Sequence, residues 1–327
     1  MPKDEKIYKF EISHRTIIFT VFFLLFLKFL WIIRDLLFSL FIAFILTAAL
    51  RPALNYLVRL KIPRILAAIF IYFSFLSFFS FVFSIFLPPL IKETIQLSRH
   101  LPFIFQSLLP SSFLFNWESI FQYLPTATTQ VFSLITGLFS NAVWFISTLF
   151  FGFYFLVEED AIKKILASFF AEEKTQRVVD FFNLLEKRIN NWFWGEIVLM
   201  VVVGSLNYIG LTLIGIKYAL PLAVLAGLLE VVPNLGPTIA AIPAILVGLS
   251  QSPFFGVSAL AVATLVQQLE NNLIVPLVMK KAVGLNPIIT LMALIIGGKL
   301  AGVLGVLLSV PMTVTLKTFF LEFLNKK

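Results

Sequence analysis

The sequence contains no cysteine, and only two of its 327 residues are histidines. Without cysteine, neither a disulfide framework nor a thiolate metal site can form. Charged residues make up 13% of the chain and hydrophobic residues 60%, and this balance excludes an ordinary soluble domain. The runs of apolar residues are long enough to cross a bilayer. We therefore expect an all-α polytopic membrane protein.

The usual signatures of catalysis are missing as well. The chain has no His-Glu-x-x-His, no Gly-x-Ser-x-Gly, no phosphate-binding loop and no intramembrane Gly-x-Gly-Asp. We therefore expect no enzyme, no ATP-driven pumping by this chain alone and no bound metal or cofactor. The net charge of +8 is attributed to loops that face anionic lipid, and not to nucleic-acid binding.

The two halves of the chain differ in composition. Of 39 phenylalanines, 33 precede residue 190, whereas 13 of 15 glycines follow it. Small residues let helices approach closely, and glycine and proline interrupt them. We interpret residues 1–190 as a Phe-rich scaffold and residues 191–327 as a Gly/Pro-rich transport domain. Compositional drift is the alternative.

Uncharged or nearly uncharged runs predict about five full transmembrane helices or more, plus two helical hairpins. The runs are 17–33 and 36–50, expected to pair as a tight hairpin, then 65–91, 131–157 and 197–216. Residues 92–130 are expected to form short amphipathic helices outside the cell, and residues 158–190 one or two cytoplasmic surface helices.

The distribution of lysine and arginine predicts the orientation. Basic residues concentrate in 51–64, 158–190, 280–281 and the C-terminal tail, so these segments and both termini are placed in the cytoplasm. Residues 218–250 must then begin and end outside, and residues 282–316 inside. Each is expected to be a hairpin, turning near Pro233–Pro237 and near Gly297-Gly298-Lys299 respectively.

An internal repeat supports this arrangement. Pro221 and Pro287 lie 66 residues apart, as do Gly236 and Gly302. Pro243 and Pro311 occur late in each hairpin. An inverted-topology repeat in the C-terminal half, common in alternating-access transporters, explains these matches. Coincidence in a background of low complexity is the alternative.

Polar residues within the apolar C-terminal half are candidates for a transport pathway. Ionisable groups are costly inside a membrane and usually face a cavity or a partner. Glu230 precedes the break at Pro233, and Gln267, Glu270 and Asn271 have the spacing of one helix face. Solvation of Glu270 at the cytoplasmic interface is the alternative. Trp192 and Trp194, beside Gly195 and Glu196, are interpreted as an interfacial aromatic anchor.

The candidate pathway residues share a position at a predicted helix break or a polar side chain at membrane depth. They are Glu230, Pro233, Asn234, Gly236, Pro237, Gln267, Gln268, Glu270, Asn271, Asn272, Pro276, Gly297, Gly298, Lys299, Gly302 and Pro311.

Several motifs resemble the autoinducer-2 exporter family, also called the PerM permease family. They are Glu230-Val-Val-Pro-Asn-Leu-Gly-Pro-Thr-Ile, Gln268-Leu-Glu-Asn-Asn-Leu-Ile-Val-Pro276, Val283-Gly-Leu-Asn-Pro287 and Gly297-Gly-Lys-Leu-Ala-Gly302-Val-Leu-Gly305. The resemblance covers roughly residues 186–317, and Asn234 departs from the aromatic residue expected in many relatives. It implies an inner-membrane permease, often an exporter of small polar signals, with some relatives similar to sodium/proton antiporters.

The sequence thus predicts a secondary transporter of a small polar solute or ion, working by alternating access and coupled to H⁺ or Na⁺. The Phe-rich half is expected to contact lipid and to form a homo-oligomer. A passive oligomeric channel and a non-transporting membrane scaffold are the alternatives.

Overall fold

The computed structural model describes residues 14–82, 84, 88, 142–158, 172–233, 235–279 and 286–323. These residues are mainly helical, with no strand among them, which confirms the expected all-α fold. Within this part, five helices are long and apolar enough to cross a membrane: His14–Ile32, Arg34–Arg59, Arg64–Val82, Thr175–Leu213 and Ile288–Phe323. The expected amphipathic segment 92–130 lies outside the described residues.

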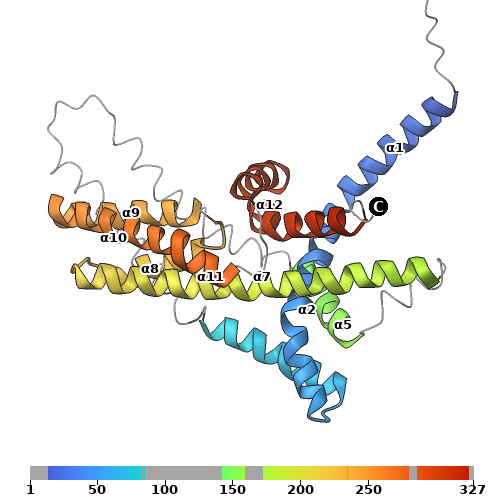
Figure 1. Ribbon diagram of the computed structural model, residues 1–327, viewed down its shortest axis with the longest axis horizontal. Coiled ribbons are helices and arrows are strands. Elements are labelled where there is room, and N and C mark those ends of the chain that lie inside the picture. Colours follow the sequence, from blue (N-terminus) through green and yellow to red (C-terminus); the bar gives the residue numbers. More distant parts are fainter. Residues whose placement is uncertain are drawn as a thin grey trace, which may run out of the picture.

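The first two helices differ from the expected tight hairpin. Helix α1 (His14–Ile32) projects away from the rest of the chain and meets α2 (Arg34–Arg59) only at their junction (Figure 1). Helix α2 also continues past Leu50, although it contains Pro52. The fully buried Leu54 packs against the helix Arg64–Val82 and against α5 (Ala142–Val157). This packing outweighs the helix-breaking tendency of the proline.

Polar contacts reinforce the packing between α2 and α5. The hydroxyls of Ser39 and Thr148 are 2.8 Å apart, and Tyr72 OH donates to the backbone oxygen of Leu149 at 2.7 Å. Gly152 lies against the backbone of Ala43, so the two helices approach closely. These contacts hold α2, Arg64–Val82 and α5 together as one packed group.

Helix α7 (Glu172–Leu213) is the longest element and runs through the middle of the molecule (Figure 1). The expected surface helix ending at residue 190 and the span beginning at residue 197 are one continuous helix. At 42 residues it is about 60 Å long, twice the roughly 30 Å of a bilayer core. Its charged N-terminal half therefore extends beyond the membrane, while residues 197–213 carry no charge.

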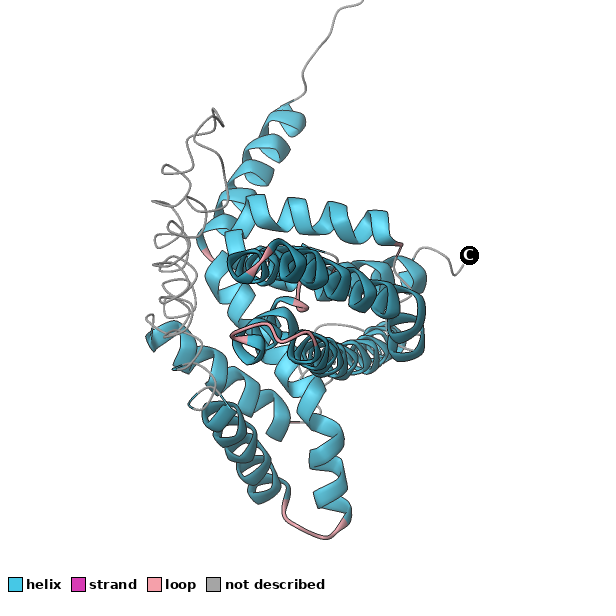
Figure 2. Cartoon of the chain, turned by 90° about the vertical axis from the view of Figure 1, so that its left-hand side faces the viewer, coloured by secondary structure: helices cyan, strands magenta, loops and turns pink. Residues whose placement is uncertain are grey.

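Two separate groups of helices pack on the two halves of α7. The N-terminal half of α7 contacts α2 and the part of α12 (Pro287–Phe323) that follows its break at Gly302. The contacts are made by Phe181 and Leu185 of α7, Ile45 of α2 and Val314 of α12. The C-terminal half of α7 contacts α8 (Ala219–Leu229) and α10 (Pro253–Leu269), which lie beside α9 (Leu235–Gln251). Figure 2 looks along these helices.

Glycines set the spacing of the helices around the first hairpin, α8–α9. A Cβ on Gly227 would lie 2.6 Å from the backbone oxygen of Met200, and one on Gly248 would lie 2.6 Å from that of Phe255. Helix α8 is thus fixed closely to α7, and α9 to α10. The predicted hairpin at 218–250 is present, and its turn follows α8 at residues 230–233.

The second hairpin lies within α12, which folds back at Ala301 and Gly302. Gly302 has φ +58° and ψ −135°, a conformation that essentially only glycine adopts. The turn is therefore a few residues beyond the expected Gly297-Gly298-Lys299. The cause is a close contact between the arms, since a Cβ on Gly297 would lie 2.3 Å from the backbone oxygen of Gly305. The glycines paired by the repeat, Gly236 and Gly302, both lie at a hairpin break.

Candidate functional site

The break between α8 and α9 brings Glu230 into the interior. The last turn of α8 ends with the Glu230 backbone N–H donating to Ala226, and the chain then reverses so that Gly236 N–H bonds to Val232 at 2.8 Å. A Cβ on Gly236 would lie only 1.8 Å from the backbone oxygen of Leu229. Only glycine fits there, and the tight reversal leaves the Glu230 side chain 1% exposed.

Glu270 enters the same region from a different helix irregularity. It begins the π-helix η1 (Glu270–Ile274), which links α10 to α11 (Val275–Met279). Such π-turns are rare and are frequent at functional sites. The wider turn shifts the register of the side chains that follow, and Glu270 is 2% exposed while Asn271 faces outward.

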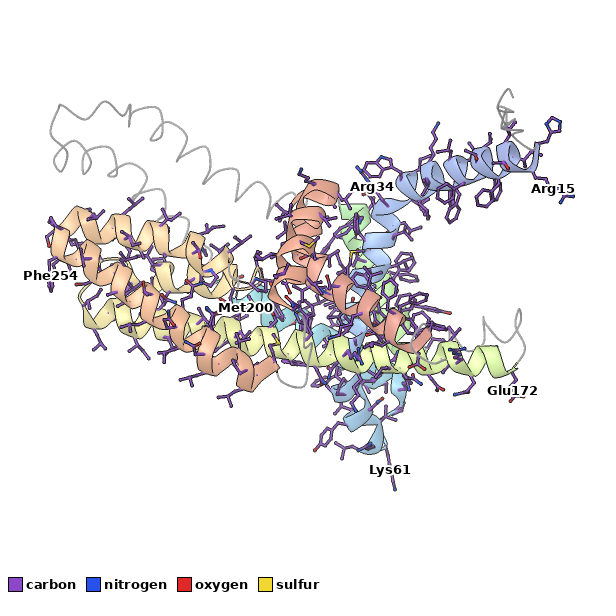
Figure 3. All side chains as sticks on the ribbon, turned by 45° about the horizontal axis from the view of Figure 1, so that its top comes forward. Arg15, Arg34, Lys61, Glu172, Met200 and Phe254 are labelled. Carbon is purple, nitrogen blue, oxygen red and sulfur yellow. The ribbon has the colours of Figure 1, made fainter. Side chains whose placement is uncertain are left out.

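A third carboxyl group, from Glu196 on α7, completes the cluster. Glu196 is 4% exposed and lies one turn before Met200, which is labelled in Figure 3. Its position is fixed on both sides. Gly195 packs against Met279 of α11, and the backbone of Met200 touches Gly227 of α8.

Sequence reasoning missed Glu196, which was assigned with its neighbours to an interfacial anchor. The spacing of apolar residues along α7 could have indicated that Glu196 is buried. Ile189, Trp192, Leu199 and Val203 are buried at spacings of three and four residues, and Glu196 occupies the remaining position of that stripe. A charged residue inside an apolar stripe indicates a buried functional group. Trp194 alone has the partly exposed position of an anchor, and its indole N–H donates to Ala49 at 3.1 Å.

The three carboxyl groups interact with one another. The carboxyl groups of Glu230 and Glu270 are close enough to share a hydrogen bond, and Glu196 interacts electrostatically with both. One oxygen of each, Glu196 Oε1, Glu230 Oε2 and Glu270 Oε2, is buried without a hydrogen-bond partner among the described residues. In the same part of the chain, no lysine, arginine or histidine forms an ion pair with any of them.

This arrangement constrains the charge of the site. A hydrogen bond between two carboxyl groups requires that one of them carries a proton. Like charges buried close together disfavour ionisation of all members, so full ionisation of the three groups would require a neutralising positive charge. The described residues contain no group of three acidic, histidine or cysteine side chains arranged to hold a metal ion.

The other predicted pathway residues surround this cluster unevenly. The exposed side chains of Gln268 and Asn272 bond to each other at 2.9 Å, and Gln267 is half-buried. Pro233, Gly236 and Pro237 form the turn beside Glu230, and Asn234 lies outside the described residues. Pro276 is exposed. In the second hairpin, Lys299 and Gly302 are exposed, Gly297 and Gly298 are half-buried and Pro311 is buried.

Long apolar helices, two hairpins with broken helices and a cluster of three buried carboxyl groups beside the first break are typical of a multi-pass helical membrane protein of the transporter class. Comparison with known proteins agrees with this class. The profile of the AI-2E family transporter matches residues 17–325, so the chain belongs to this family.

Three relatives illustrate how far the similarity extends. "Putative transport protein YueF" of Bacillus subtilis (strain 168) is 29% identical over 92% of this chain and 87% of its own. "Putative transport protein YhhT" of Escherichia coli (strain K12) is 28% identical over 68% of this chain and 62% of its own. "Putative permease PerM" of the same strain is 31% identical over 41% of this chain and 38% of its own.

Proposed function

We propose that the protein is a secondary transporter of a small polar solute or ion, driven by a gradient of H⁺ or Na⁺. The observation that carries this proposal is the contact between Glu230 and Glu270. The two side chains come from a broken helix and a π-turn, and both are buried without a cationic partner among the described residues. A carboxyl pair of this kind binds and releases a proton or a monovalent cation.

The fold supports alternating access as the mechanism. The first hairpin is held closely to α7 and α10 by Gly227 and Gly248, so it suits a fixed part of the site. In α12, the arm after the break packs on α7, where Thr318 accepts a hydrogen bond from Arg188 at 3.1 Å. Most of the side chains of the arm before the break are exposed or half-buried. We propose that this first arm moves to expose the site to either side.

The remaining assignments follow from the sequence and form part of the same proposal. We place the protein in the cytoplasmic membrane with both termini inside, as a homo-oligomer. Residues 1–190 act mainly as scaffold and residues 191–327 contain the transport site. Because the sequence motifs resemble those of an exporter family, we propose that the solute is exported.

The test is ion-gradient-driven flux in proteoliposomes containing the full chain. An imposed Na⁺ gradient is expected to move protons, recorded with a pH-sensitive dye inside the vesicles, and an imposed pH gradient is expected to move ²²Na⁺. Glu230→Gln and Glu270→Gln should each reduce this exchange ~10-fold or more. Glu172→Gln changes an exposed carboxyl group at the start of α7 and serves as the matched control.

The outcomes distinguish a coupled transporter from the two alternatives, an oligomeric channel and a membrane scaffold. Gradient-dependent exchange that disappears in either site variant supports the coupled transporter. Flux that does not saturate and ignores both gradients favours an oligomeric channel. Absence of flux of H⁺, of Na⁺ and of every small polar solute tried, with all variants folded, favours a membrane scaffold.

A further inference from the structure

Glu196 is the buried carboxyl group that the paired site at Glu230 and Glu270 leaves unexplained. It belongs to α7, which also forms the interface with α2 and α12, and it is 4% exposed. Its Oε1 atom has no hydrogen-bond partner among the described residues. An unpaired buried carboxylate is costly in a membrane, so the group needs a neutralising charge.

The elements packed against Glu196 supply more negative charge and no described positive charge. Glu230 follows α8, and Glu270 begins η1. On α7 itself, the buried Trp192 indole N–H lies beside Glu196 but does not complete a hydrogen bond of standard geometry. Residues 280–285, which follow α11, lie outside the described part of the chain. Within the described part, protonation or a bound cation is therefore the means of neutralising Glu196.

The three carboxyl groups need more than one positive charge if none of them is to remain a buried, uncompensated carboxylate. Among the described residues, no three acidic side chains are arranged to hold a metal ion. The Glu230–Glu270 contact needs one proton of its own, as any hydrogen bond between two carboxyl groups does. That proton is held between α8 and η1, whereas Glu196 belongs to α7. Glu196 therefore needs a positive charge in addition to the proton of the neighbouring pair.

We propose that Glu196 is a second proton-carrying group, so that each transport cycle moves two protons, one on the Glu230–Glu270 pair and one on Glu196. In the loading step the Glu196 carboxylate takes a proton from water on one side, and in the release step the carboxylic acid returns it to water on the other. This inference rests on the proposed coupled transport and specifies its stoichiometry. Exchange of two protons for one Na⁺ moves net charge, so the wild-type cycle responds to membrane voltage.

The experiment uses the full chain in proteoliposomes, with Na⁺-driven proton movement recorded at several imposed potassium diffusion potentials. The wild-type exchange rate should change with voltage. Glu196→Gln should leave exchange of one proton for one Na⁺, which is electroneutral and insensitive to voltage. Glu196→Asp keeps the acid and should keep the voltage response. Trp192→Phe removes the neighbouring N–H but no carboxyl group, and should also keep it.

Infrared difference spectra between acidic and alkaline pH provide a second readout that does not depend on transport. The carboxyl C=O bands of the wild type should contain one contribution lost in Glu196→Gln and another lost in Glu230→Gln. The inference is overturned if Glu196→Gln leaves these bands unchanged, or if wild-type exchange is electroneutral. If the wild type shows no Na⁺-driven proton movement, the proposed coupling fails, and the infrared bands alone decide whether Glu196 titrates.

Discussion

The carboxyl groups of Glu230 and Glu270 lie in hydrogen-bonding contact, although one follows the break of the first hairpin and the other begins a π-turn in the next helix pair. Both side chains are almost completely buried. A carboxyl–carboxyl hydrogen bond contains a proton, so in the proposed cycle this pair holds a proton while the site is closed. Opening of the site to water by the first arm of α12 would let that proton exchange with one side of the membrane.

The first prediction concerns these two residues individually. Glu270→Gln and Glu230→Gln should each reduce gradient-driven exchange by ~10-fold or more, since an altered barrier of ~1.4 kcal/mol already gives a factor of ten. In Glu230→Gln the amide can still donate a hydrogen bond to Glu270, so the variant mimics the protonated state. Both proteins should therefore fold and elute from size-exclusion chromatography as the wild type does. Exchange at wild-type rates in both would exclude the pair as the coupling site.

The second prediction concerns competition between protons and Na⁺. Acidic conditions keep the shared proton in place, whereas alkaline conditions remove it and leave adjacent negative charges that attract a cation. The Na⁺ concentration for half-maximal exchange should therefore fall as pH rises, measured as ²²Na⁺ uptake across a pH series. In Glu230→Gln the residual uptake should depend less on pH. A half-maximal concentration that is the same at every pH would contradict a shared binding site.

Comparison of the fold with the sequence shows which features local patterns could predict. Pro233, Gly236 and Pro237 identified the first hairpin break because proline and glycine act locally on the backbone. The position of the second break depended on a tertiary contact, the approach of Gly297 to Gly305, which no local pattern reveals. The continuity of α7 was missed because its charged and apolar halves differ in environment but not in backbone conformation.

Some features of the candidate site could likewise be predicted from the sequence, and others could not. Glu230 and Glu270 were predicted because each is an isolated acid in a long apolar run. Their contact with one another could not be predicted, since it depends on how α8, α10 and α11 pack on α7. Glu196 was missed because it follows two tryptophans, and aromatic residues near a charge are typical of a membrane interface. Its place in the buried stripe of Ile189, Leu199 and Val203 was the stronger signal.

The third prediction compares two adjacent glycines of the second hairpin. A Cβ on Gly297 would lie 2.3 Å from the backbone oxygen of Gly305, so Gly297→Ala should force the arms of α12 apart. The nearest atom to a Cβ on Gly298 is a side-chain methyl of Val306 at 3.2 Å, which can shift. Gly297→Ala should lower the thermal unfolding midpoint and reduce exchange, with a cost in the ~1–3 kcal/mol range of overpacking. Gly298→Ala is the matched control and should lose much less. Equal effects of the two substitutions would contradict the close packing of the arms.

The fourth prediction concerns the link between the scaffold and α7. Arg51 of α2 bonds to Glu186 of α7 at 2.5 Å and also donates to the backbone oxygen of Phe155 of α5 at 3.0 Å. Both side chains of the ion pair are 18% exposed. Removing one partner of a fully buried ion pair costs about 3–5 kcal/mol, and a partly buried pair such as this one costs less. Arg51→Ala should therefore lower the unfolding midpoint in detergent substantially, and Arg59→Ala, at an exposed position of the same helix, should have little effect.

A variant that keeps part of these contacts separates the contributions. Glu186→Gln leaves Arg51 bonded to Phe155 and replaces the carboxylate by a neutral acceptor, so it should destabilise the protein less than Arg51→Ala. Because Glu186 and Glu196 belong to the same continuous helix, loosening α7 from α2 should also alter the position of the site. We therefore expect Arg51→Ala to slow Na⁺-driven proton movement even at temperatures where the protein stays folded. Normal exchange in a destabilised Arg51→Ala protein would show that the ion pair contributes to stability alone.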